Sequence, residues 1–249
     1  MPQTDSDNSV SSDPSDVEST RWSLVLDAAH RSVPGSDEAL ETLCGIYWFP
    51  LYAYARRRVR DSNEALDLTQ EFFSKLLEKN YLAEADPTRG RFRGFLFTVF
   101  KHFLSNEWSK TRAQKRGGGK TVVSMDVAAA EARINLEAVD DETPQKRFDR
   151  EWAETLVNYV LELVGQGYSE RGESATFERL RQFVSSSRER DSYANVAKSL
   201  AIEVGAVRVA VHRLRQRFRQ KLRQEIAETV QDPQEVDDEI RSLLEIMSS

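Results

Sequence analysis

The chain has 249 residues, 39% of them apolar, and a formal net charge of −6. This length accommodates one or two small domains, and the low apolar content disfavours a single large core. One cysteine, Cys44, excludes an internal disulfide, and the sequence shows neither a membrane-spanning apolar run nor a secretion signal. We therefore expect a soluble, cytoplasmic protein in which residues 1–20, rich in Ser and Asp, form a disordered acidic tail.

Charge is strongly segregated along the chain. Residues 1–20 carry five acids and no base, and residues 225–245 carry eight acids against Arg241 alone. Basic residues cluster at 56–60, 89–93, 110–120 and 208–223. The net negative charge therefore does not exclude binding to nucleic acid, because each basic cluster can act locally.

The periodicity of apolar residues predicts four helices in the first half of the chain. They cover residues 22–30, 37–60, 62–78 and 91–113, and a turn at residues 86–90 precedes the last of them. Ser62 is the expected N-cap of the third helix. One face of this helix carries the polar residues Asp67, Gln70, Glu71 and Ser74, which by themselves indicate only a solvated surface.

The helix predicted at residues 91–113 has an apolar arc of about 220°, wider than the roughly 100° that a surface helix needs. Its other face carries Arg93, Thr98, Lys101, His102, Ser105 and Asn106, bordered by Phe95, Phe97 and Trp108. Aromatic side chains beside a basic polar face are suited to capturing unstacked bases. The alternative, favoured when this helix is considered alone, is that the surplus aromatic residues pack between three helices.

Residues 116–143 are predicted to be a flexible linker, and the Ala/Glu-rich stretch after Ser124 is expected to be partly helical. The stretch from Arg116 to Thr121 resembles the end of a phosphate-binding loop, but Gln114 stands where that motif needs glycine. A second helical block then starts at Thr143-Pro144, where proline is tolerated in the first turn, and another helix is expected at residues 174–186. Residues 227–249 form an acidic C-terminal extension with a short amphipathic piece, which comprises Ile240, Leu243, Leu244 and Met247.

Residues 193–223 are predicted to form two helices around a tight turn near residues 200–203. In the second helix the apolar residues fall on one stripe, which comprises Val204, Val207, Val211, Leu214, Phe218 and Leu222. Its other faces are basic and carry small residues near the start, where the backbone can approach base edges in the major groove. This pattern is typical of a helix-turn-helix whose second helix enters the groove.

No catalytic or metal-binding pattern is present in the sequence. His30, His102 and His212 are far apart and lack partners at metal-ligand spacing, and no carboxylate pair stands out among the many acids. We predict a protein that is not an enzyme and uses no cofactor or metal. Cys44 is expected to be a small buried apolar side chain.

Taken together, these segments resemble bacterial RNA polymerase sigma factors of the sigma-70 superfamily, in particular the two-domain extracytoplasmic-function (ECF) group. Asp67-Leu-Thr-Gln-Glu71 resembles the polymerase-docking motif of region 2, and Phe92-Arg-Gly-Phe-Leu-Phe97 resembles the start of the helix that melts and reads the −10 element. Residues 193–219 resemble region 4, which binds the −35 element. The resemblance implies an all-α fold of two small helical domains: region 2 at residues 21–115 and region 4 at residues 144–226.

The resemblance also implies roles for individual residues. The residues implied in core-polymerase binding are Asp67, Leu68, Gln70, Glu71 and Phe72. Those implied in −10 DNA binding are Arg93, Phe95, Lys101, His102 and Asn106, and those implied in −35 binding are Ser192, Tyr193, Arg208, Val209, His212, Arg213 and Arg215. The implied partners are core RNA polymerase, through its β′ clamp helices and β flap, promoter DNA and, as a candidate, an anti-sigma factor, with no insertion into a membrane.

Two other functions stay open from the sequence. A helix-turn-helix regulator that acts without polymerase would use residues 193–223 but would leave the polar face at Asp67, Gln70 and Glu71 unexplained. A protein-interaction adaptor could instead bind acidic partners, including its own tails, through its basic helices. Salt-dependent DNA binding without sequence preference or transcription would favour the adaptor.

Overall fold

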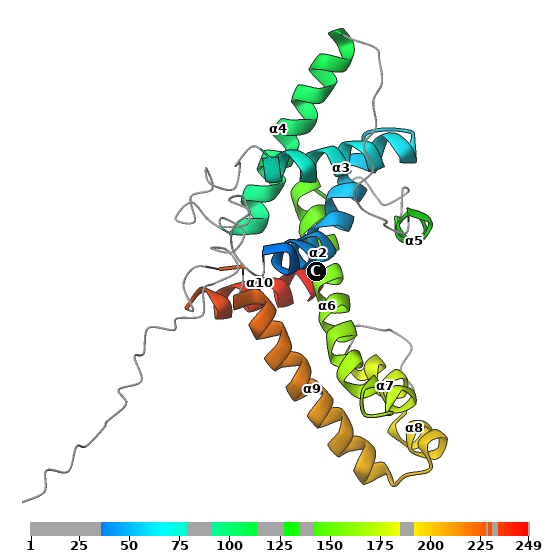
Figure 1. The fold of residues 1–249 in the computed structure, drawn as a ribbon. Helices are drawn as coiled ribbons and strands as arrows, with labels where there is room; N and C mark the ends of the chain where they lie inside the picture. The colour runs from blue at the N-terminus through cyan, green and yellow to red at the C-terminus, as the bar shows by residue number, and fades with distance from the viewer. Residues whose placement is uncertain are drawn as a thin grey trace, which may run out of the picture.

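The computed structural model describes residues 36–78, 91–113, 127–134, 142–184, 192–227, 229–230 and 234–248. The secondary structure of these residues is helical and includes no strand, as Figure 1 shows. The all-α prediction is therefore confirmed. The acidic tail, the helix predicted at residues 22–30, the turn at residues 86–90 and the glycine-rich stretch at residues 117–119 lie outside the described residues.

Three helices, α2 (Ser36–Arg56), α3 (Ser62–Glu78) and α4 (Phe92–Ala113), form the N-terminal part. The helix predicted at residues 37–60 ends instead at Arg56, because the chain turns there and places Val59 in the core. Asp61, rather than the expected Ser62, caps α3: its carboxylate accepts a hydrogen bond from the Asn63 amide at 2.9 Å.

The aromatic residues of α4 build most of the core between these helices. The ring of Phe100 lies 4.8 Å from that of Phe72 in α3, and the ring of Phe97 lies 4.8 Å from that of Tyr54 in α2. Phe97 also stacks on Phe148 of α6 (Pro144–Ser169), with 4.6 Å between ring centroids. Such close aromatic pairs stabilise a core beyond the area that they bury. Most aromatic residues of α4 therefore pack between helices, which is the alternative to base capture that the sequence left open.

A short helix, α5 (Val127–Arg133), lies within the predicted linker and packs against α2. Glu131 accepts hydrogen bonds from the Tyr52 hydroxyl at 2.6 Å and from Nε of Arg56 at 2.9 Å. The guanidinium of Arg133 lies 3.7 Å from the centre of the Phe49 ring. The helix expected in this part of the linker is therefore confirmed, whereas its packing against the N-terminal core was not predicted.

Helix α6 contributes to both hydrophobic clusters that the described residues form. Its first half, including Phe148 and Trp152, belongs to the larger cluster, and Val164 and Tyr168 belong to the smaller one. Thr143 caps the helix and Pro144 is its first residue, as predicted. The smaller cluster is completed by α7 (Ser174–Leu180), a 3-10 turn (Arg181–Phe183), α8 (Tyr193–Leu200) and α9 (Val204–Ala227).

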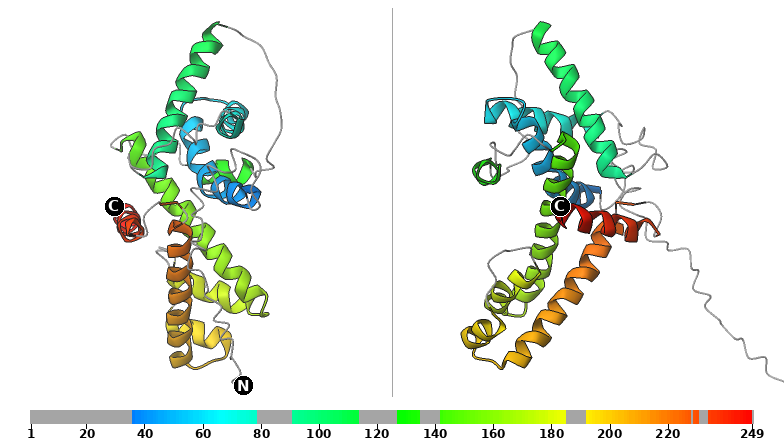
Figure 2. Two further views of the ribbon diagram at one scale, coloured as in Figure 1. Left: turned by 60° about the vertical axis from the view of Figure 1, so that its left-hand side comes forward. Right: turned by 180° about the vertical axis from the view of Figure 1, so that it is seen from behind.

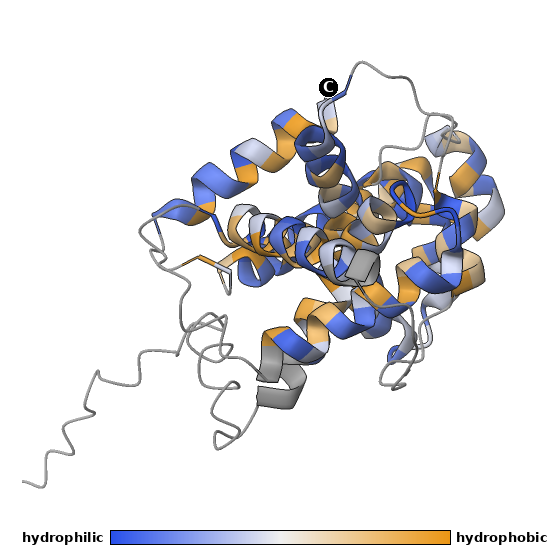
Figure 3. Cartoon of the chain, turned by 90° about the horizontal axis from the view of Figure 1, so that it is seen from above, coloured by the Kyte–Doolittle hydropathy of each residue, from blue (hydrophilic) through white to orange (hydrophobic). Residues whose placement is uncertain are grey.

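The C-terminal extension forms α10 (Glu235–Ser248), which lies against α6 and the end of α9 (Figure 2). Val236 and Leu243 are buried in the larger cluster, where Leu222 and Ile226 of α9 join them. The predicted apolar stripe is only partly correct, because Leu244 is 58% exposed and Glu239 is buried. Hydropathy colouring in Figure 3 shows hydrophobic residues gathered where the helices face one another. None of the described helices is long and apolar enough to cross a membrane.

Candidate nucleic-acid interface

Helices α8 and α9 meet at a tight turn, as the sequence predicted. Ser192 caps α8 by accepting a hydrogen bond from the Asn195 amide at 3.1 Å. Ala201 ends α8 in the left-handed conformation, with φ of 53°, and the Ile202 amide bonds back to the Ala197 carbonyl at 3.0 Å. The left-handed residue reverses the chain within a few residues, so that α9 begins at Val204.

The predicted apolar stripe holds α9 against the rest of the smaller cluster. Val207, Val211 and Leu214 are at most 2% exposed. Gly165 of α6 allows a close approach nearby, since a Cβ atom at this position would lie 2.7 Å from the Phe177 ring. The packing fixes which side of α9 faces solvent.

The solvent-facing side of α9 presents small and basic residues. Gly205, Ala206, Arg208, Val209, His212 and Arg213 are all exposed. Val209 is 49% exposed, although it is apolar. Arg208 and Arg213 form no hydrogen bond or ion pair with any described residue, so their guanidinium groups are available to a ligand on this side.

Three other residues implied in −35 binding have structural contacts. Arg215 donates two hydrogen bonds to the Phe183 carbonyl, at 3.2 and 3.0 Å. Tyr193 stacks on Phe183 with 4.7 Å between parallel rings, and Ser192 forms the α8 cap. These contacts position the helix-turn-helix, and spacing along α9 could not distinguish Arg215 from its exposed neighbours.

The polar face predicted on α4 is solvent-exposed along most of its length. Thr98, Lys101, His102, Ser105 and Asn106 are all exposed. Phe95 and Trp108 are half-buried at the borders of this face, and Nζ of Lys101 lies 5.6 Å from the centre of the Phe97 ring. Lys101, His102 and Asn106 therefore lie together on one accessible surface, with an aromatic residue near each end.

Arg93 differs from the other α4 candidates because it is only 6% exposed. Its Nε donates to Asp149 of α6 at 3.1 Å, NH2 donates to Ser242 of α10 at 2.9 Å, and NH1 bonds to Glu239. Burial lowers the pKa of Arg93, while the charge of Asp149 opposes the shift. In this conformation Arg93 joins three helices and does not face solvent, a role that the sequence did not indicate.

Helix α3 presents its acids to solvent and its aromatic residues to the core. Asp67 and Glu71 are exposed, Leu68 and Gln70 are half-buried, and Phe72 is 1% exposed. Lys75 binds Glu71 at 2.5 Å and Glu107 of α4 at 2.8 Å. Burial opposes the charge of Lys75, but its hydrogen bonds to these two carboxylates outweigh burial and raise its pKa.

Among the described residues, no group of three or more His, Cys, Asp or Glu side chains is placed to hold a metal ion. Cys44 packs half-buried against the larger cluster. Burial, with a smaller contribution from Glu41, raises the pKa of its thiol to about 12. The thiolate is therefore scarce at neutral pH, and this site is poorly suited to redox chemistry.

Within the described residues the fold is all-helical, α8 and α9 form a helix-turn-helix, and α4 and α9 each expose a face with basic and polar side chains. The family model of sigma-70 region 2 matches residues 50–114, from the end of α2 through α3 and α4. Comparisons with curated proteins and with solved structures found no match. Residues 50–114 are thus similar to region 2 of the sigma-70 family of RNA polymerase sigma factors.

The match indicates a general activity. It supports a sigma-factor role in RNA polymerase binding and promoter melting. The matched region contains the polar face of α3 and the whole of α4, but it ends before α5. Roles for α6 to α10 therefore depend on their geometry and contacts.

Proposed function

We propose that the protein is an alternative sigma factor of the ECF type that directs polymerase to −35 and −10 promoter elements. The observation that carries this proposal is the presence of two separate exposed faces that carry polar and basic side chains. One is on α4, within the matched sigma region, and the other is on α9 of the helix-turn-helix (Figure 1). The corresponding domains are region 2 at residues 21–115 and region 4 at residues 144–226.

The exposed face of α3 is the proposed contact with core polymerase. Asp67 and Glu71 offer carboxylates to solvent one helical turn apart, with Gln70 beside them. We assign this face to the β′ clamp helices, and the β flap is the proposed partner of region 4. Phe72 supports the face from the core, because its side chain is buried against Phe100 and Phe103.

The exposed face of α4 is the proposed −10 site. His102 and Asn106 can hydrogen-bond an extruded base, Lys101 can contact phosphate, and Phe95 offers a ring at the border. Capturing a base that has left the stack lowers the free energy of the melted state relative to the duplex. Polymerase would then carry out the chemistry of RNA synthesis.

The start of α9 is the proposed −35 reader. Arg208, Val209, His212 and Arg213 lie on its exposed side, where a recognition helix contacts base edges. Arg213→Ala should cost about 1–3 kcal/mol of binding at the −35 site and relax base choice. Arg219→Ala, further along the helix, should weaken binding equally on all sequences.

Reconstituted transcription tests the whole proposal. Purified protein added to sigma-free core polymerase from its own host, with a genomic fragment library, should produce specific start sites. Asp67→Asn should reduce polymerase binding and initiation, whereas Glu64→Gln, an exposed neutralisation on the same helix, should not. DNA binding without any polymerase association would favour the helix-turn-helix regulator, and sequence-independent binding without transcription would favour the adaptor.

A further inference from the structure

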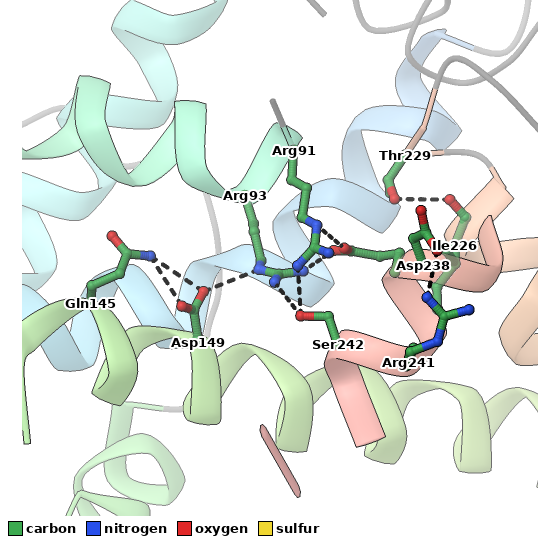
Figure 4. Close-up of polar contacts among 10 residues, drawn as sticks. Arg91, Arg93, Gln145, Asp149, Ile226, Thr229, Asp238, Arg241 and Ser242 are labelled. Carbon is green, nitrogen blue, oxygen red and sulfur yellow. Dashed lines mark hydrogen bonds and ion pairs between the residues drawn. The ribbon is translucent and has the colours of Figure 1, made fainter. Parts of the chain in front are cut away.

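The C-terminal helix α10 neutralises arginines at the start of the proposed −10 helix. Glu239 is 4% exposed, bonds to NH1 of Arg93, and lies 2.8 Å from Nε of Arg91. The Ser242 hydroxyl accepts hydrogen bonds from Arg91 at 2.6 Å and from Arg93 at 2.9 Å. Figure 4 shows Arg93 between Asp149 of α6 and Ser242 of α10.

The three guanidinium nitrogens of Arg93 bond to two different helices, α6 and α10, so one helix can hold Arg93 if the other moves away. Nε bonds to Asp149, and the centre of the Trp152 ring lies 4.4 Å from the guanidinium carbon. Both residues belong to α6, which therefore fixes the Nε side of the guanidinium group. Both terminal nitrogens bond to α10. If α10 moved away, Arg93 would keep its orientation from α6 while both terminal N–H groups became available.

The charges around Arg91 and Arg93 favour binding of an anion when α10 is displaced. Arg91 and Arg93 face Asp149 and Glu239, so the four groups are neutral together in the closed arrangement. Without Glu239, two cations face one acid. Arginines that present N–H groups from a fixed position are well suited to a phosphate group.

The apolar attachment of α10 involves one side of the helix. Val236 and Leu243 are buried, Ile240, Ile246 and Met247 are partly buried against the larger cluster, and Leu244 is exposed. Arg223 of α9 binds Asp237 of α10, but both side chains are more than half exposed. Exposed pairs of this kind contribute little stability, whereas the contacts at Arg91 and Arg93 involve the buried carboxylate of Glu239.

We propose that Arg91 and Arg93 form a phosphate-binding site for the promoter backbone, and that Glu239 of α10 occupies this site as an intramolecular latch. The proposal rests on the proposed sigma function and adds a regulatory step to it. DNA and α10 compete for the same guanidinium groups, so DNA phosphate displaces α10, and loss of α10 contacts strengthens DNA binding.

Two neutralising variants of the full-length protein test the latch. Glu239→Gln removes the latch charge and keeps its shape. Asp238→Asn makes the same change in net charge at an adjacent exposed residue whose ion pair is with Arg241 of α10 itself. Affinity for random-sequence single-stranded DNA suits this test, because phosphate contacts do not depend on base sequence.

We expect Glu239→Gln to tighten DNA binding about fivefold or more, a typical coupling between competing sites, and Asp238→Asn to leave it close to wild type. Equal affinities for the two variants, or weaker binding by Glu239→Gln, would overturn the latch. Thermal unfolding followed by circular dichroism shows whether each variant is folded. If Glu239→Gln unfolds, Ser242→Ala, which removes a hydroxyl shared by both arginines, should shift affinity in the same direction.

Displacement of α10 can be measured directly with spin labels. In a Cys44→Ser background, labels at Thr98→Cys on α4 and Leu244→Cys on α10 occupy exposed positions. The distance between them should become longer or broader when the DNA is added, and no change at saturating DNA would contradict displacement. This readout needs no polymerase, so a displaced α10 without any reconstituted initiation would refute the sigma function and leave the latch standing.

Discussion

Arg93 of α4 is buried between two acids, whereas Arg208 and Arg213 of α9 are exposed and pair with no described residue. Both helices are assigned to DNA, and both present polar faces beside an apolar core. The difference lies in their surroundings. Helix α10 covers the start of α4, whereas α9 begins after a turn that is exposed to solvent. A basic residue in a helix assigned to DNA therefore need not be exposed, since Arg93 is held by both α6 and α10.

The same contrast exists within α3, where Phe72 is buried and Asp67 is exposed. Phe72→Ala should give the largest effect, a loss of about 3–5 kcal/mol of unfolding free energy, because it removes a ring packed against Phe73, Phe100 and Phe103. Asp67→Ala should change stability by less than about 0.5 kcal/mol. Urea unfolding of both variants measures this difference. A stable Phe72→Ala protein that loses polymerase binding would instead place Phe72 at the polymerase contact.

Within α9, Arg215 is held by contacts inside the protein, whereas Arg213 is exposed, so the two residues allow the same comparison on one helix. Arg215→Ala should lower the unfolding free energy by about 1–3 kcal/mol, because the Phe183 carbonyl loses two hydrogen bonds from a charged donor. Arg213→Ala should leave stability nearly unchanged and lower affinity for −35 DNA.

Unfolding curves and duplex binding on the same two proteins separate these effects. If Arg215→Ala kept full stability but lost affinity, its side chain would leave Phe183 to contact DNA. If both variants lost stability, Arg213 would have a structural partner in solution.

The sequence was sufficient where a local pattern determines the structure. The stripe through Val207, Val211 and Leu214 predicted the buried side of α9, and the turn after Leu200 was confirmed. The match to sigma-70 region 2 covers residues 50–114, which include the Asp67–Glu71 motif that contributed to the resemblance. These features depend on neighbours within a few residues along the chain, which periodicity and capping preferences describe well.

Contacts between distant segments were not predictable in the same way. Arg93 bonds to Asp149 and Glu239, residues far apart along the chain, and no periodicity connects them. Glu239 was hidden among eight acids in residues 225–245, although its position on the same side as Val236 and Leu243 is an indication that could have been used. Similarly, Glu131 lay in a stretch interpreted as linker, and only tertiary packing shows its contact with Tyr52.

Ser192 tests whether the helix-turn-helix depends on its cap. Ser192→Ala should lower the unfolding free energy by about 1 kcal/mol, because the Asn195 amide loses its acceptor at the start of α8. Ser199→Ala, on the same helix, removes only a bond back to the Val196 carbonyl and should cost less than about 0.5 kcal/mol. Thermal unfolding of the two variants measures this difference in stability. Equal costs would mean that the α8 amides find other partners.

The smallest expected effect concerns Glu131, which joins α5 to the end of α2, within the matched sigma region. Burial disfavours its charged form, but hydrogen bonds from Tyr52 and Arg56, with the Arg56 charge, outweigh burial and lower the pKa of Glu131. Stability from this group is therefore present above the ordinary glutamate pKa and is lost as the pH falls through the lowered value.

Glu131 is about a third exposed, so solvent weakens the pair, and Glu131→Gln should cost no more than about 1 kcal/mol at neutral pH. Unfolding free energies of the wild type and Glu131→Gln should converge as the pH falls below the lowered pKa. A difference that stayed constant with pH would show that shape and hydrogen bonding, rather than charge, hold α5 on α2. A difference that grew in acid would mean that Glu131 is protonated more readily in the folded protein than in the unfolded chain.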